Sequence, residues 1–152
     1  MAKLTFSING KNANATRLDV KARSFSVVVD EPADLGGTDA GPNPVEYVLA
    51  GYAGCLNVVG HLVAKEMGME LKKFAVEVAG DLNPARFMGQ DTPERAGFQQ
   101  IRVKISADTS ADDATLAKWL EAVEGRCPVS DNLSHATPIS VGVNDLPPIV
   151  KH

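Results

Sequence analysis

Two cysteines, Cys55 and Cys127, are the side chains of this 152-residue sequence best suited to covalent chemistry. Cys127 precedes Pro128 where a helix is expected to begin, so its sulfur would face free backbone N–H groups and the positive end of a helix dipole. That setting stabilises a thiolate. Cys55 lies in the middle of an apolar helix, where burial disfavours a thiolate unless a cation is near. The local settings alone therefore indicate a reactive Cys127 and a Cys55 that serves as a small core side chain.

The two thiols are expected to be either inert core residues or redox-active. In a reducing cytosol they would not form a permanent structural disulfide, and two are too few for a thiolate zinc site. His61 and His135 are interpreted as core or surface residues, because Cys55 and His61 are separated by about 240° around a helix. The sequence also lacks a Gly-x-Ser-x-Gly nucleophile motif and the spacing of a phosphate-binding loop. No metal and no cofactor is predicted.

The helix expected to carry Cys55 has a clear start signal. Asn43 is expected at the N-cap, Pro44 at the first helical position and Glu46 in a capping box, which offers Glu46 a structural role. The helix should run to about Met67 and end at Gly68.

This helix has 18 residues without a formal charge between Glu46 and Lys65, at the edge of the length that spans a membrane. Asn57, His61 and three glycines argue against a span. We expect a helix buried on all sides at the centre of the fold, with glycines where another backbone comes close.

Alternating apolar residues predict strands on both sides of the helix. Near the N-terminus Leu4, Phe6 and Ile8 alternate with polar residues, and Asn9-Gly10 is expected to form a turn. The segments 31–43 and 83–98 are expected to be loops, the second a candidate functional loop. The expected order begins with strands within 3–30, the long helix, and strands at 71–82 and 99–107. It continues with a helix capped by 110–113 and ending at Gly125, a helical turn at 127–133 and a strand at 139–143. This order is typical of an α+β fold, as a single domain over residues 1–152.

Composition narrows the class of protein further. Hydrophobic residues make up 44% of the sequence and charged residues 22%, which is ordinary for a globular domain. The 15 Lys and Arg against 19 Asp and Glu give a formal net charge of −4, with no basic cluster, which argues against a nucleic-acid partner. The N-terminus has no apolar targeting segment. We expect a cytoplasmic protein that binds neither nucleic acid nor membrane.

Two motifs at a fixed separation give a more specific indication. The segment GGTDAGPNPVEYVLAGYAGCLNVV, followed 72 residues after its cysteine by RCPVSDNL, resembles the OsmC/Ohr family of osmotically inducible and organic hydroperoxide resistance proteins. The resemblance implies an OsmC-like fold, with antiparallel sheets packed around a long central buried helix in an intertwined homodimer. It also implies a thiol-dependent peroxidase, in which Cys55 is peroxidatic and Cys127 resolving. Glu46 matches the family's carboxylate, and Arg17 fits the position of its arginine better than Arg23.

By this resemblance the partners are a small hydroperoxide, preferably organic, and a dithiol reductant such as a lipoylated protein. The residues around each cysteine depart from the hydroperoxide-resistance branch and lie closer to the OsmC-like branch. An alternative is therefore an OsmC-like binding protein, whose apolar interface pocket holds a small ligand without turnover.

The spacing of Glu46 and Cys55 bears on assembly. Nine residues of helix place them on opposite faces, about 13.5 Å apart along the axis, so one straight helix cannot direct both to one thiol. Either the helix breaks at Gly51 or Gly54, or the carboxylate comes from a second chain. We favour a homodimer with a shared site.

Overall fold

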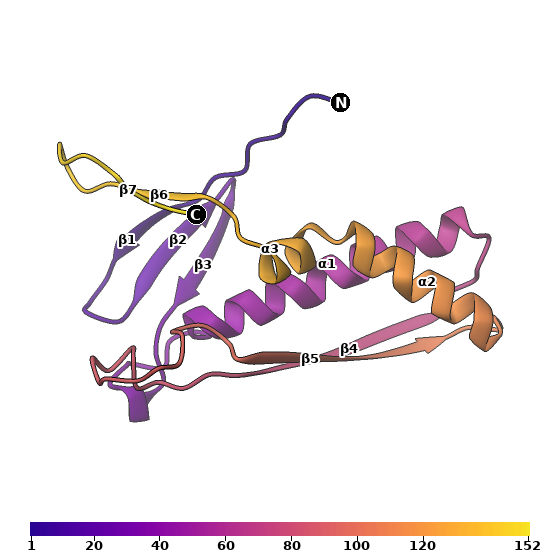
Figure 1. Cartoon of the computed structure of the whole chain (residues 1–152), viewed down its shortest axis with the longest axis horizontal. Helices are drawn as coiled ribbons and strands as arrows, with labels where there is room; N and C mark the ends of the chain where they lie inside the picture. Colours follow the sequence, from indigo (N-terminus) through magenta and orange to yellow (C-terminus); the bar gives the residue numbers. More distant parts are fainter. The chain divides into compact units, whose positions relative to one another are not determined.

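The computed structural model describes residues 1–152, with seven strands and three α-helices labelled in Figure 1. The chain divides into two units, residues 1–50 and residues 51–152, which are described in turn. Helix α1 (Pro44–Glu66) begins in the first unit and continues into the second. Because helices and antiparallel strands occur together, the expected α+β class is confirmed.

The first unit contains a three-stranded antiparallel sheet of β1 (Asn9–Asn12), β2 (Leu18–Ala22) and β3 (Phe25–Val29). The expected turn at Asn9-Gly10 is wrong, because these residues lie within β1. The chain turns instead after β1, where Asn14 Oδ1 accepts the backbone N–H groups of Thr16 and Arg17 at 2.9 and 2.7 Å. The expected strand at residues 4–8 is also absent, and its apolar side chains are exposed.

The loop after β3 is fixed by one buried carboxylate. Asp30 is fully buried and accepts hydrogen bonds from Thr38 Oγ1, the Glu31 N–H at 2.8 Å and the Ala40 N–H at 3.1 Å. The hydrogen bond from Thr38 holds the pKa of Asp30 well below its usual range. Gly37 packs so tightly that a Cβ would lie 1.7 Å from the Glu31 carbonyl oxygen. The loop expected at 31–43, which includes a 3₁₀ turn at Ala33–Leu35, is therefore confirmed and ordered.

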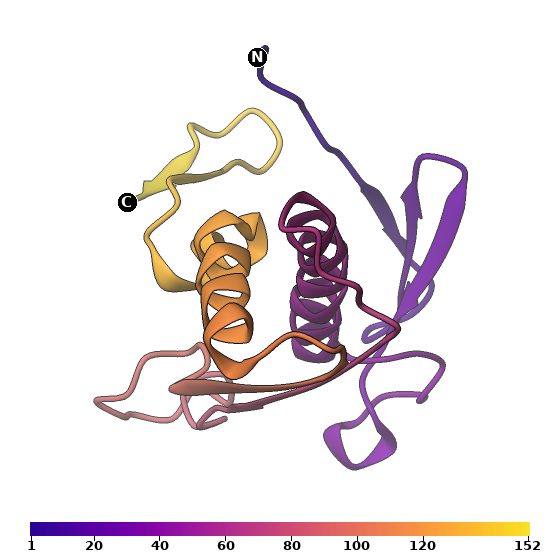
Figure 2. The same ribbon diagram turned by 90° about the vertical axis from the view of Figure 1, so that its right-hand side faces the viewer.

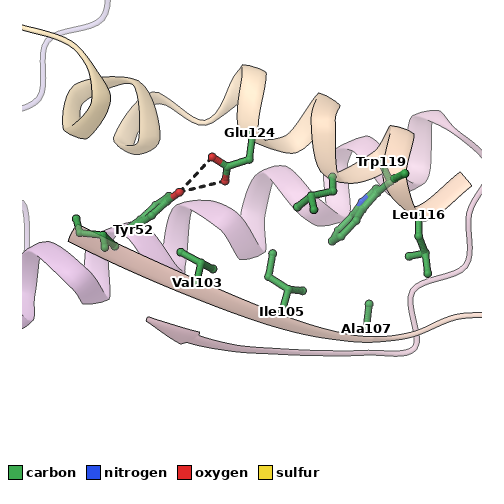
Figure 3. Close-up of a pocket in the computed structure, with 10 residues that line it drawn as sticks. Tyr52, Val103, Ile105, Ala107, Leu116, Trp119 and Glu124 are labelled. Atoms are coloured by element: carbon green, nitrogen blue, oxygen red, sulfur yellow. Dashed lines mark hydrogen bonds between the residues drawn. The ribbon is translucent and has the colours of Figure 1, made fainter. Parts of the chain in front are cut away.

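The second unit is built on a two-stranded antiparallel sheet of β4 (Lys73–Asp81) and β5 (Gln100–Asp108), whose side chains alternate between a covered and an exposed face. The α1 residues from Gly51 onward and α2 (Asp113–Arg126) lie side by side over the covered face (Figure 2). Strand β5 directs Val103, Ile105 and Ala107 toward the helices (Figure 3). The chain continues through α3 (Pro128–Ser134) and the pair β6 (Ile139–Val141) and β7 (Ile149–Lys151).

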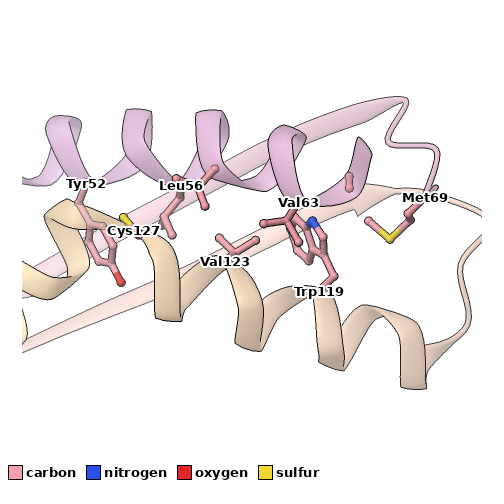
Figure 4. Packing of buried hydrophobic residues seen from close by; sticks show 9 residues of the cluster. Tyr52, Leu56, Val63, Met69, Trp119, Val123 and Cys127 are labelled. Carbon is pink, nitrogen blue, oxygen red and sulfur yellow. The ribbon is translucent and has the colours of Figure 1, made fainter. Parts of the chain in front are cut away.

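The core of the second unit forms where α1, α2 and the start of α3 meet (Figure 4). Leu56, Val63 and Val123 are almost completely buried, and Cys127 belongs to the same cluster. Trp119 Nε1 donates to the Gly60 carbonyl oxygen at 2.9 Å, so the indole N–H is satisfied within the core. This packing fixes the position of α2 on α1.

In a single copy of the chain, helix α1 is buried on one face only, so its burial on all sides stays a prediction. Its buried residues form one face, whereas Val58 is 65% exposed and Leu62 is 47% exposed. The reason is that the β4–β5 sheet and α2 cover one side of the helix only. By length and composition α1 could also cross a membrane, but the core helix of a soluble protein passes the same test.

Replacement of Gly60 by Ala tests the contact between α1 and α2. A Cβ at this position would lie 3.1 Å from Trp119 Cζ2 and 3.4 Å from Phe74 Cε2. Overpacking costs about 1–3 kcal/mol, and the better helix propensity of Ala offsets about 1 kcal/mol. We expect Gly60→Ala to lower the free energy of unfolding in urea by about 1 kcal/mol. Gly125→Ala, in α2 with open space around the new Cβ, should not lower it. Equal stability of the two variants would contradict this packing.

Candidate functional site

The sulfurs of Cys55 and Cys127 lie 2.8 Å apart, although the residues are 72 positions apart in the sequence. Both cysteines are free, and Cys127 Sγ donates a hydrogen bond to Cys55 Sγ. A disulfide needs a sulfur–sulfur distance of about 2.05 Å, so a short rearrangement would bring the two sulfurs to bonding distance. The local chemistry therefore suits reversible closure of a disulfide.

Cys127 is held at the junction of α2 and α3. It is the C-cap of α2 and the N-cap of α3, with Pro128 as the first residue of α3. Its sulfur accepts a hydrogen bond from the Ser130 N–H at 3.4 Å, as the helix-start setting predicts. The side chain is only 1% exposed, so its thiol is enclosed by protein.

Cys55 projects from the half-buried side of α1 toward this junction. Burial raises the pKa of the Cys55 thiol, and the neighbouring Cys127 sulfur and the charge of Glu124 raise it further. A hydrogen bond from the Val129 backbone N–H acts in the opposite direction. No cation is among the groups that shift this pKa. The setting within the second unit therefore favours the thiol, as the sequence predicts for a cysteine in the middle of an apolar helix.

A polar cluster of Tyr52, Glu124 and Ser130, called here the Glu124 cluster, lies beside the cysteines. The Tyr52 hydroxyl lies 3.1 and 3.2 Å from the two Glu124 carboxylate oxygens, and Ser130 Oγ donates to Glu124 Oε2 at 2.8 Å. Sequence analysis missed these residues. A signal was present in the spacing, because Tyr52 and Glu124 each precede a cysteine by three residues, one helical turn.

An apolar groove of about 630 Å³ opens between β5 and α2 (Figure 3). Tyr52 and Glu124 line it together with side chains that are otherwise apolar or small: Ile101, Val103, Ile105, Ala107, Leu116, Ala117, Trp119 and Leu120. The volume lies within the range of small-molecule sites. The contact between Tyr52 and Glu124 therefore lies next to both the groove and the cysteine pair.

Glu46 forms the capping box that its position predicts. The Asn43 N–H donates to Glu46 Oε2 at 2.8 Å, and the Glu46 N–H donates to Asn43 Oδ1 at 2.9 Å. Helix α1 is continuous from Pro44 to Glu66, so the break considered at Gly51 or Gly54 does not occur. Helix geometry consequently keeps Glu46 on the face opposite Cys55 of its own chain.

The two candidate arginines belong to the first unit, and each has a local partner. Arg17 Nε donates to Asp19 Oδ1 at 2.8 Å, which raises the pKa of the guanidinium. Arg23 has a positive φ of 57° in the turn between β2 and β3, and its guanidinium carbon lies 5.0 Å from the centre of the Phe25 ring. Neither contact tests which of the two is the active-site arginine, so the choice of Arg17 over Arg23 stays a prediction.

The candidate histidines are both exposed side chains. His61 Nδ1 pairs with the Asn57 carbonyl oxygen at 2.9 Å, and His135 pairs with Asp131. No three His, Cys, Asp or Glu side chains are grouped so that they could hold a metal ion.

Comparison with known structures supports the fold. An OsmC-like protein from Mycoplasma pneumoniae is similar at 18% identity and a TM-score of 0.77, covering 88% of this chain and 89% of that one. An organic hydroperoxide resistance protein OsmC from Legionella pneumophila is similar at 20% identity and a TM-score of 0.63, covering 88% and 91%. One from Elizabethkingia anophelis is similar at 21% identity and a TM-score of 0.62, covering 86% and 88%.

Comparison by sequence defines the family. None of the curated proteins compared with the chain matches it in sequence. The family model described as OsmC-like protein matches residues 37–142, which include the end of the loop after β3, both cysteines and the β4–β5 sheet beneath them. The chain therefore belongs to the OsmC-like protein family.

Proposed function

We propose that this protein is a thiol-dependent peroxidase that reduces organic hydroperoxides, with Cys55 as the peroxidatic and Cys127 as the resolving residue. The observation that carries the proposal is the 2.8 Å separation of the two free sulfurs. Similar structures described as organic hydroperoxide resistance proteins support the substrate class. The role suits defence against oxidative stress in the cytoplasm, where thiols are kept reduced.

The chemistry proceeds in three balanced steps. The Cys55 thiolate attacks the terminal, hydrogen-bearing oxygen of the hydroperoxide, the O–O bond breaks, and the alkoxide leaves as an alcohol after taking a proton. Cys55 is then a sulfenic acid. The Cys127 sulfur bonds to the Cys55 sulfur, and the sulfenic hydroxyl leaves with the Cys127 proton as water. A dithiol reductant, such as a lipoylated protein, reduces the resulting disulfide and is itself oxidised.

Burial supports the order of the two cysteines. Cys55 is half-buried, whereas Cys127 is enclosed at 1% exposure. A hydroperoxide can therefore approach Cys55 from solvent, while Cys127 meets only the Cys55 sulfur. The helix start at Cys127, taken alone, favoured Cys127 as the nucleophile. That interpretation took no account of the difference in solvent access between the two cysteines.

The proposed reaction requires a cation near Cys55, because its thiol is held protonated within the second unit. We assign this cation to Arg17, on its spacing to the loop after β3. Glu46 would orient the guanidinium through a bidentate pair. Since Glu46 and Cys55 face opposite sides of one continuous helix, the carboxylate that serves each thiol comes from a second copy of the chain.

The exposed face of α1 supports a homodimer. Val58 and Leu62 are exposed there, and Gly51 and Gly54 have no atoms within 4 Å of the position of a Cβ, so another helix could approach closely. Exposed apolar side chains at the N-terminus, Leu4, Phe6 and Ile8, add unpartnered surface. A dimer interface formed by these surfaces would be obligate and larger than about 2,000 Å².

A second candidate function is the binding of a small apolar ligand without turnover. The groove between β5 and α2 favours it, because its lining is mostly aliphatic and aromatic. In that case the protein would bind a hydrophobic probe but would not consume peroxide. The variants below separate the two functions.

The first prediction concerns peroxide consumption by the purified protein with reduced lipoamide. Wild type should consume cumene hydroperoxide faster than hydrogen peroxide, and Cys55→Ser should lose activity completely. Cys127→Ser should lose turnover but still form a sulfenic acid at Cys55 that dimedone traps. Trapping at Cys127 in the Cys55→Ser variant would reverse the assignment, and an inert wild type would favour the binding function.

The second prediction concerns the pH dependence of Cys55. The negative charge of Glu124 is one cause that raises the pKa of Cys55, so Glu124→Gln should lower that pKa. The midpoint of Cys55 alkylation by iodoacetamide, followed by mass spectrometry, should move to lower pH. Glu121→Gln removes a charge from the same helix outside the Glu124 cluster and should leave the midpoint in place. A midpoint that stays or rises in Glu124→Gln would contradict the interpretation.

The third prediction concerns assembly. Wild type should be a dimer by light scattering at micromolar concentration. Val58→Glu places a charge on the exposed face of α1 and should produce a monomer, whereas Lys118→Glu, on the exposed side of α2, should remain a dimer. A monomeric wild type would exclude the shared site.

A further inference from the structure

The Glu124 carboxylate connects three helices beside the cysteine pair. It accepts hydrogen bonds from Tyr52 on α1 and Ser130 on α3, and it belongs to α2 itself. Tyr52 and Ser130 are each 7% exposed, so their hydroxyl groups need partners within the protein. Figure 3 shows the two contacts between Tyr52 and Glu124. No step of the proposed reaction uses this carboxylate.

Each hydroxyl that binds Glu124 belongs to a residue within about one helical turn of a cysteine. Tyr52 precedes Cys55 by one turn of α1, and the Ser130 backbone N–H donates to Cys127 Sγ at 3.4 Å. The hydrogen bonds of Glu124 therefore hold the start of α3 against α1 at the level where the two sulfurs meet.

We propose that Glu124 is a positioning residue for disulfide closure, which keeps Cys127 within reach of the oxidised Cys55. The inference rests on the proposed function and assigns a role within its second step. In that step the Cys127 sulfur bonds to the Cys55 sulfur, the S–O bond of the sulfenic acid breaks, and the hydroxyl leaves with the Cys127 proton as water. Glu124 does not touch the reacting atoms.

The geometry makes the rate of disulfide closure depend more strongly on Glu124 than the rate of peroxide attack does. Closure requires the sulfurs to approach from 2.8 Å to about 2.05 Å with a defined torsion, so a small shift of α3 lowers its rate. Attack on a hydroperoxide involves Cys55 and a mobile substrate, and does not depend on α3 in this way. Loss of Glu124 should therefore leave Cys55 as a sulfenic acid for longer and allow further oxidation to sulfinic acid.

The fold can tolerate removal of the carboxylate. Tyr52 OH and Ser130 Oγ lie 3.3 Å apart and can hydrogen-bond to each other, so Glu124→Ala does not leave both hydroxyls without a partner. Glu124 itself is exposed, and no cavity in the core follows from its truncation. A suitable control is Glu121→Ala, an exposed glutamate on the same helix that lies outside the Glu124 cluster.

The experiment measures two rates in the full-length protein after one equivalent of cumene hydroperoxide. Dimedone trapping reports sulfenic acid at Cys55, and mass spectrometry reports the Cys55–Cys127 disulfide. We expect Glu124→Ala to form the sulfenic acid at least as fast as wild type, because loss of the Glu124 charge removes one cause that raises the pKa of Cys55. It should close the disulfide about tenfold more slowly, because displacement of a reacting group by about 1 Å has effects of this order or larger. Glu121→Ala should match wild type in both rates.

Further variants separate positioning from a general loss of structure. Tyr52→Phe and Ser130→Ala should each slow closure, and the effect of combining either with Glu124→Ala should be smaller than the sum of the two single effects, because all three act through one carboxylate. Glu124→Gln keeps a carbonyl oxygen that can accept a hydrogen bond, and should restore part of the closure rate. If Glu124→Ala does not fold, the Glu124→Gln and Ser130→Ala variants decide the question by the same two rates.

A second oxidant makes failure of the inference distinct from failure of the proposed function. Diamide, an azo compound, oxidises two thiols to a disulfide and is reduced to a hydrazine, so it closes the pair without a sulfenic acid. If wild type does not react with peroxide, the peroxidase proposal fails, and slower closure of Glu124→Ala with diamide still supports the positioning role. Wild-type closure rates of folded Glu124→Ala with either oxidant would overturn it.

Discussion

The contact between Cys55 and Cys127 depends on how the junction of α2 and α3 packs against α1. The junction is fixed by the buried side chains Leu56, Trp119 and Val123, and by the hydrogen bond of Trp119 to the Gly60 carbonyl oxygen. One cysteine comes from the middle of α1 and the other from the helix junction, so neither local segment could form the pair alone. The candidate chemistry is thus a property of tertiary packing. The absence of a Cβ at Gly60, which allows the indole to approach α1, is part of the same arrangement.

The same packing creates a conflict between burial and reactivity. Enclosure brings the sulfurs together but raises the pKa of Cys55 and places a carboxylate nearby. A peroxidatic cysteine must be ionised, so the proposed site requires a cation from outside the second unit. The continuous α1 helix and its exposed apolar face make a second chain the source that we favour for the supporting carboxylate. Catalysis and assembly are therefore linked in this account.

The features that the sequence predicted correctly depend on residues close together in the chain. The capping box of Asn43 and Glu46, the helix start at Pro128 and the alternation in β4 and β5 all follow from local spacing. Family motifs identified the pair of cysteines, and the structure confirms that their sulfurs are adjacent. Local spacing misled at Asn9-Gly10, because the side chain of Asn14 forms the turn and strand pairing includes both residues.

Other features depend on contacts that sequence spacing does not contain. The exposure of Val58 is determined by how much of α1 the sheet and α2 cover, which apolar composition alone does not indicate. The contact between Tyr52 and Glu124 joins residues 72 positions apart, and a glutamate on an exposed helix face is ordinarily a solvated side chain. The role of each site residue, and the choice of Arg17, rest on the family resemblance.

The most direct test of the central claim is a count of thiols during titration with limiting cumene hydroperoxide. If Cys55 and Cys127 of one chain form the redox pair, each peroxide molecule consumes two thiols. Peptide mapping should then find one disulfide between these residues, formed at a rate independent of protein concentration. Loss of a single thiol per peroxide, or a disulfide between chains, would contradict the account.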